Sequence, residues 1–190
     1  MADRLPVVDV MPNNLRIHKM HERHRALTPA IAGCYEEAAS VCLSDRNTPP
    51  IDIELSDNGR VFEASVSWSV PDSRVLAAYA NSTDATEFGA YGCVIAGVEL
   101  SRDIFAVRRA ETGTGADYYV GPADSGVEDL EDCSRLEVSG IREGDYKLVA
   151  RRLTEKVAQA RRGNSSLPAL AGVMGFSAKV LLMKDVVRDE

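Results

Sequence analysis

The sequence lacks the short patterns that assign many enzymes to a class. It has no P-loop, no dinucleotide-binding glycine fingerprint, no GxSxG elbow and no Cys/His nucleophile pattern, so none of those activities is indicated. Its four cysteines show no CxxC pairing, and without a secretory signal we expect them to be reduced and mostly buried. The start, MADRLPVVDVMPNNL, does not have the apolar run of a signal peptide, and no stretch reaches membrane-spanning length. We therefore expect a cytoplasmic protein that makes no membrane contact.

An excess of positive charge is also absent. The formal net charge of −7 argues against a surface that coats nucleic acid indiscriminately, although a local basic face is compatible with it. The chain has 190 residues, 45% of them hydrophobic, which is enough for one globular domain with a real core and too short for two large ones. Length and composition therefore predict a single domain, over residues 28–190. Residues 1–27 lack an amphipathic repeat, so we expect them to form an N-terminal arm.

The predicted arm contains all three histidines, His18, His21 and His24. Their spacing of three could bring two of them onto one helical face as metal ligands. No cysteine is near them, however, and the segment has no clear helical pattern. We expect a cationic arm that touches a partner or another subunit in preference to a zinc site.

The first part of the domain, residues 28–80, is expected to hold a helix and a β-hairpin. Thr28 is the N-cap of the helix, followed by a proline at the first helical position. Apolar and polar residues then alternate from Ile51 to Val70, interrupted by Asn58 and Gly59, which accept positive φ in a turn. We expect this hairpin to join the main sheet or form a subunit contact, because an isolated hairpin is marginally stable in water.

The later part reads as a helix, three strands, a helix and a strand. Residues 84–101 form a predicted helix with a glycine-lined surface, and Asp84 and Glu87 in it have capping-box spacing. The predicted fold class is α/β (α+β), a mixed central sheet flanked by helices. The other predicted elements are strands over residues 103–111, 116–121 and 134–141, a helix over 145–163, and apolar strands over 167–176 and 178–187.

Two adjacent strands of this group, over residues 116–121 and 134–141, carry a carboxylate that could serve a site. Asp117 stands at the beginning of the second strand, and Glu137 lies in the third strand on the face opposite to its apolar neighbours. If the strands pair, the two carboxylates can converge at one end of the sheet. A buried carboxylate without a partner is costly or becomes neutral. A divalent cation, Mg²⁺ or Mn²⁺, would remove that cost, activate water and stabilise charge on phosphate oxygens.

The order αβββαβ, with Asp117 at the second strand and Glu137 in the third, resembles the PD-(D/E)xK nuclease superfamily. The resemblance covers roughly residues 84–176 and leaves the first hairpin and the arm unexplained. It implies a restriction-endonuclease-like core that hydrolyses DNA or RNA with a divalent metal. It also implies metal ligands at Asp117 and Glu137, with Glu87 on the preceding helix as a supplementary acid.

Ser139 stands where the motif of that superfamily has its lysine. Serine cannot supply the cation that positions water or offsets charge in the transition state. Either the cation has moved to the following helix, where Arg152 and Lys156 can share a face, or catalysis has been lost. The catalytic candidates are therefore Asp117, Glu137 and Lys156.

The helix over residues 145–163 is rich in basic residues. One interpretation is a face that contacts nucleic-acid phosphates. The other is a solvated helix surface with cations near the helix end. The candidate nucleic-acid-binding residues on it are Lys147, Arg151, Arg152 and Lys156.

Each of the acids also has a purely structural interpretation. Glu87 can complete the capping box of its helix, and Asp117 can cap the TGTG turn that precedes it. Glu137 can pair with Arg108 or Arg109 on a neighbouring strand, since such cross-strand pairs are common.

Two functions are compatible with these residues. The leading hypothesis is a metal-dependent phosphodiesterase that acts on nucleic acid. The alternative, favoured by Ser139, is a non-catalytic protein of the same fold that serves as an interaction subunit of an oligomer or of a larger protein assembly. The glycine-lined helix and the hairpin both offer packing surface, so we expect a homodimer.

Overall fold

The computed structural model describes residues 13–163 and 165–187, and the first 12 residues of the predicted arm lie outside this part. The elements follow one another along the chain as η1 (Met20–Glu22), α1 (Pro29–Ser44), β1 (Ile51–Asp57), β2 (Arg60–Val66), α2 (Ser73–Ala78), α3 (Ser82–Arg102), β3 (Phe105–Arg109), β4 (Tyr118–Gly121), β5 (Ser134–Ile141), α4 (Tyr146–Arg161), β6 (Ala169–Gly175) and β7 (Val180–Asp185).

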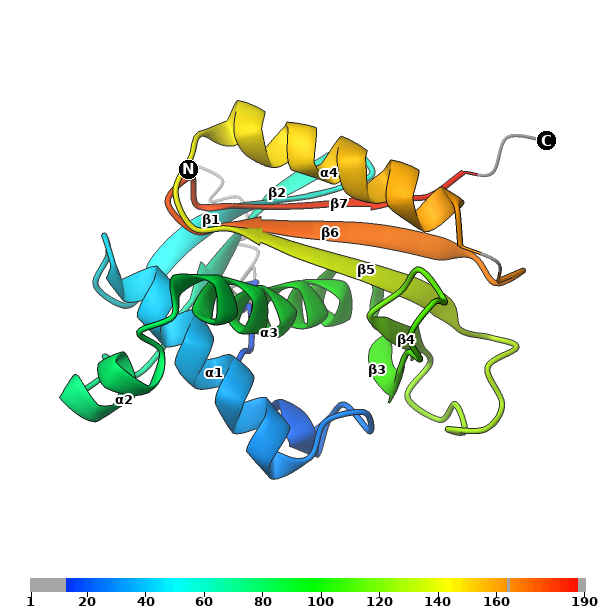
Figure 1. Ribbon diagram of the computed structural model, residues 1–190, viewed down its shortest axis with the longest axis horizontal. Helices are drawn as coiled ribbons and strands as arrows, with labels where there is room; N and C mark the ends of the chain where they lie inside the picture. Colours follow the sequence, from blue (N-terminus) through cyan, green and yellow to red (C-terminus); the bar gives the residue numbers. More distant parts are fainter. Residues whose placement is uncertain (1–12, 164, 188–190) are drawn as a thin grey trace, which may run out of the picture.

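The strands form one mixed, seven-stranded sheet in the order β2-β1-β7-β6-β5-β4-β3. β1 pairs with β7 and β5 with β6 in parallel, and the other neighbours are antiparallel. Figure 1 shows α4 on one face of the sheet and α1 and α3 on the other. The predicted fold class is confirmed, and the helix, three strands, helix and strand expected in the later part are α3 to β6.

The predicted hairpin lies at one edge of the sheet. Asn58 and Gly59 have φ of 50° and 83°, as the tight turn between β1 and β2 requires. β1 pairs with β7 on its other side, so the hairpin extends the main sheet, which is one of the two outcomes expected. β2 ends at Val66, before the predicted end at Val70, because the chain there leaves the sheet toward α1, where the Trp68 indole N–H donates to a serine.

The N-cap of α3 differs from the predicted one. The Asn81 side chain accepts hydrogen bonds from the N–H groups of Thr83 and Asp84, so the helix begins at Ser82. The capping box of Asp84 and Glu87 is therefore wrong, because an asparagine earlier in the chain already caps the first turn. Glu87 lies in the second turn, where its carboxylate meets a tyrosine instead.

The glycines of α3 pack inside the molecule. A Cβ at Gly89 would lie 3.1 Å from the backbone of Ala38 in α1, and a Cβ at Gly97 would overlap the Leu181 side chain of β7. The missing side chains let α3 lie close to α1 on one side and to the sheet on the other. The glycine-lined surface that the sequence offers for a homodimer is thus filled by elements of the same chain.

Residues 13–27 are closely packed, in contrast to the loose arm that the sequence predicts. Leu15, Ile17 and Met20 are buried in the main core, and His24 is fully buried with its Nε2 3.0 Å from Glu99. These residues enter the core from irregular chain and a single 3-10 turn. Burial of this kind has no regular spacing, which is why an amphipathic repeat could not reveal it.

The remaining differences are small. α2 has no buried residue, so no apolar pattern predicts it. Every residue of β6 is buried, as the continuous apolar run indicates.

Within residues 13–163 and 165–187, none of the helices combines the length and the apolar character needed to cross a bilayer.

Candidate functional site: an acid cluster at the open side of β5

Asp117 lies where β4 begins and β5 loses its neighbour on that side. β4 pairs only with residues 134–136 of β5. The Oδ2 atom of Asp117 accepts a hydrogen bond from the backbone N–H of Val138, at 2.8 Å. Val138 lies just beyond the part of β5 that pairs with β4, so the carboxylate satisfies a backbone N–H that has no partner strand there. The bond also fixes the carboxylate against β5. Asp117 therefore caps the open part of β5, and not the preceding TGTG turn.

Glu137 lies on the face of β5 that α4 covers. Its Oε1 is 2.7 Å from Nζ of Lys156, and the two side chains are 5% and 19% exposed. The predicted pairing of Glu137 with Arg108 or Arg109 is wrong, because β4 separates β3 from β5 in the sheet. The cation comes instead from the helix packed above β5.

Asp117 and Glu137 line the same cleft, next to the β3–β4 loop, so the charge of one carboxylate acts on the other. Burial raises the pKa of Glu137, the hydrogen bond from Lys156 lowers it, and the negative charge of Asp117 raises it again. The net shift is upward. Two carboxylates that repel each other in a partly dry site gain from any cation placed between them.

Tyr91 of α3 joins Glu87 to Asp117. Its hydroxyl oxygen is 2.8 Å from Asp117 Oδ1 and 3.1 Å from Glu87 Oε1. A hydroxyl carries a single proton, so it donates to one of these carboxylates at a time. Burial, helped by the charge of Asp117, raises the pKa of Tyr91, which keeps the hydroxyl protonated. We call Glu87, Tyr91, Asp117, Glu137 and Lys156 the acid cluster.

Arg109 of β3 lies beside the acid cluster. Its guanidinium carbon is 4.6 Å and 4.7 Å from the ring centres of Tyr91 and Tyr118, and its Nη2 donates to the Tyr91 hydroxyl at 3.1 Å. The same nitrogen is 3.9 Å from Asp117 Oδ1. Tyr91 and Arg109 are site residues that the sequence does not predict. A tyrosine on a helix face and an arginine on an edge strand have no signature that separates them from packing or surface residues.

The cations of α4 divide into two groups. Lys156 belongs to the acid cluster, and Nη1 of Arg152 is 3.5 Å from Oγ of Ser139, the residue at the motif's lysine position. Lys147 is exposed and lies on the side of the helix opposite to Lys156, and Arg151 is exposed with its Nε 3.8 Å from Oε1 of Glu155. Of the four candidate nucleic-acid-binding residues, the structure therefore brings Arg152 and Lys156 to the site and leaves Lys147 and Arg151 on the solvent side.

Two clefts meet at the acid cluster. The first cleft, of about 450 Å³, lies between the N-terminal half of α3, the end of β5 and α4. The second cleft, of about 660 Å³, lies between the β3–β4 loop and the C-terminal half of α4. Asp117 and Lys156 line both clefts, Arg152 lines the first, and Arg109 and Arg162 line the second.

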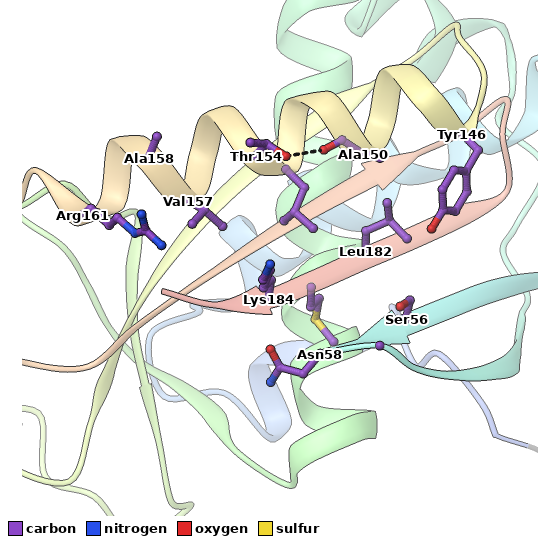
Figure 2. A pocket seen from close by; sticks show the side chains of 13 residues that line it. Ser56, Asn58, Tyr146, Ala150, Thr154, Val157, Ala158, Arg161, Leu182 and Lys184 are labelled. Carbon is purple, nitrogen blue, oxygen red and sulfur yellow. Dashed lines mark hydrogen bonds between the residues drawn. The ribbon is translucent and has the colours of Figure 1, made fainter. Parts of the chain in front are cut away.

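A groove of about 600 Å³ lies elsewhere, between α4, β7 and the β1–β2 turn (Figure 2). Figure 2 shows Val157 of α4 and Leu182 of β7 on its apolar sides, with Asn58 and Lys184 on the sheet side. The described residues that line this groove include no carboxylate. It therefore offers neither the metal ligands nor the acid–base groups of the acid cluster.

The donor atoms of the acid cluster suit a hard cation, since Mg²⁺ and Mn²⁺ prefer carboxylate oxygens. Within residues 13–163 and 165–187, no three His, Cys, Asp or Glu side chains already stand in a metal-binding arrangement. The carboxylates instead meet Tyr91, Val138 and Lys156. Asp117 and Glu137 could take up a metal by exchanging these partners.

No family model, curated protein or solved structure matches this chain. The acid cluster and its two clefts are therefore the basis for assigning a function.

Proposed function

We propose that this chain is a metal-dependent phosphodiesterase that acts on nucleic acid. Asp117 and Glu137 hold Mg²⁺ or Mn²⁺, and Glu87 is a supplementary acid. Lys156 provides the cation that Ser139 cannot. The observation that carries the proposal is that Asp117, Glu137 and Lys156 line one cleft, with Nζ of Lys156 2.7 Å from Oε1 of Glu137.

The residues around the acid cluster have roles that suit phosphoryl chemistry. A metal bound there supplies Lewis acidity toward a phosphate oxygen and lowers the pKa of a bound water. Lys156 holds a fixed positive charge where negative charge grows on the phosphate, which is worth most in a partly dry site. Arg152 and Arg109 contact phosphates in the two clefts and orient the substrate. Val138 N–H keeps the Asp117 carboxylate in place.

A second function is that of a non-catalytic scaffold of the same fold. It is supported by the hydrogen bonds that the carboxylates of the acid cluster already accept within the protein. Both oxygens of Asp117 and one oxygen of Glu137 already have hydrogen-bond donors in the protein. These bonds tie α3, β5 and α4 together without a metal. A chain of this kind would serve as a subunit of a homo-oligomer or would bind another protein.

Cleavage assays separate the two functions. The full chain is incubated with labelled DNA and RNA, single- and double-stranded, in Mg²⁺, in Mn²⁺ or in EDTA. The proposal predicts metal-dependent cleavage that Asp117→Asn and Glu137→Gln each abolish, whereas the exposed control Asp124→Asn cleaves like the wild type. Folded wild-type protein that cuts none of these substrates with either metal would favour the scaffold function.

A further inference from the structure

The acid cluster opens on two sides. The first and second clefts share Asp117 and Lys156, so the candidate reacting position lies between them and not at the end of a blind pocket. Along α4, Arg152 lines the first cleft, Lys156 lines both and Arg162 lines the second. At a rise of 1.5 Å per residue, Arg152 and Arg162 are about 15 Å apart along the helix axis, the length of a few nucleotides.

The groups that face the two clefts suit phosphates better than bases. Arg152, Lys156, Arg109 and Arg162 place cations along the whole path. Among the described residues that line the clefts, Tyr91 supplies the aromatic ring, and it is 3% exposed and lies under the Arg109 guanidinium. Bases therefore have no aromatic surface on which to stack, and contacts to phosphates carry no sequence information.

The size of the clefts limits what can enter them. Their volumes, about 450 and 660 Å³, are in the range of small-molecule pockets and hold a few nucleotides of one strand. Volumes in the range of small-molecule pockets do not enclose a double helix, which carries two paired strands side by side. The wall of the second cleft is also braced: Nη1 of the buried Arg135 donates to the carbonyls of Thr114 and Ala160, at 3.2 Å each, and so joins the β3–β4 loop to α4.

We infer that a single strand of nucleic acid crosses the acid cluster from one cleft to the other, so that hydrolysis falls on an interior phosphodiester, independently of sequence. The inference rests on the proposed function and specifies its substrate. In the reaction, the oxygen of water bonds to phosphorus and the P–O bond to the leaving sugar oxygen breaks. One proton of the water goes to that oxygen, and the other stays on the incoming oxygen as the new P–OH group.

The test compares closed circular single-stranded DNA and RNA with the same molecules made linear and with duplexes, all in Mn²⁺. We expect circular and linear single strands to be cut at equal initial rates, and duplexes at least about tenfold more slowly. Cleavage of linear but not circular strands would mean that the enzyme needs a chain end. Cleavage of duplexes at the same rate as single strands would mean that the site does not require a single strand. Either result overturns the inference and leaves the proposed function standing.

Binding provides the second readout, which does not need catalysis. Fluorescence anisotropy of a labelled single strand in EDTA is measured for Arg152→Gln in the first cleft, Arg162→Gln in the second and Lys147→Gln on the far side of α4. We expect each cleft variant to bind about threefold or more weakly and to reduce the salt dependence, with Lys147→Gln closer to the wild type. If no substrate is cut, the proposed function fails, yet this pattern would still support the path of the strand. Equal binding by all three variants would overturn it.

Discussion

Replacing Lys156 by methionine is expected to destabilise the fold through Glu137. The change keeps most of the aliphatic stem and removes the ammonium group that lies 2.7 Å from Glu137 Oε1. Removing one partner of a buried ion pair costs about 3–5 kcal/mol, because the other charge is left buried without compensation. Lys156 is 19% exposed and Glu137 5%, so water can reach part of the pair. We expect a loss near the lower end, about 3 kcal/mol.

The loss should depend on pH with a definite sign. Burial already raises the pKa of Glu137 above its usual 4.5, and removal of Lys156 raises it further. A carboxyl whose pKa is higher in the folded than in the unfolded state makes folding less favourable as pH rises from 4.5 through the folded value. The Lys156→Met variant should therefore lose more stability relative to the wild type near neutral pH than near pH 4.5.

Urea unfolding followed by circular dichroism at both pH values measures these effects. Lys147→Met, on the exposed side of the same helix, is the matched control and should stay within about 0.5 kcal/mol of the wild type. Lys156→Met combined with Glu137→Gln should regain much of the lost stability, because no unpaired charge remains. If Lys156→Met is as stable as Lys147→Met, or if it loses the same stability at both pH values, Lys156 does not stabilise the fold through the charge of Glu137.

Three further changes test other contacts. Tyr91→Phe removes the hydroxyl that bridges two acids and should cost about 1 kcal/mol in a thermal melt, and an unchanged melt would count against the bridge. Although burial acts in the opposite direction, hydrogen bonds from His24 and a neighbouring arginine lower the pKa of Glu99 to about 2. Its contribution to stability should be complete above pH 4.5 and disappear as pH falls toward 2, and Glu99→Gln should flatten that part of the stability profile. Gly140→Ala would place a Cβ 2.7 Å from the carbonyl oxygen of Thr86 and should lower stability by about 1–3 kcal/mol, whereas a neutral effect would mean that α3 can move away from β5.

Local patterns in the sequence were sufficient for much of the fold. The Asn58-Gly59 turn and the alternation around it specify a hairpin, and the continuous apolar run specifies β6. The structure differs from the prediction in two places, the packing of residues 13–27 and the residue that caps α3, and each difference has a local cause. Leu15 and Ile17 are buried without any period, and the side chain of Asn81 caps α3 three residues before Asp84.

The candidate site could be predicted only in part, because it depends on the order of strands in the sheet. Helical spacing was enough to place Lys156 on a face with Arg152. The partner of Glu137 was not predictable, since the sequence does not say that β4 separates β3 from β5. Tyr91 and Arg109 meet the acids only through the packing of α3 and β3, so no spacing along the chain marks them.

Isothermal titration calorimetry of the full chain with Mn²⁺ measures directly whether the acid cluster binds a metal. Asp117 and Glu137 are the proposed ligands, so the wild type and the exposed control Asp124→Asn should bind the ion alike. Asp117→Asn and Glu137→Gln should each weaken binding by more than about tenfold. Wild-type protein that binds no Mn²⁺, or amide variants that bind it as tightly as the wild type, would contradict a metal site at the acid cluster.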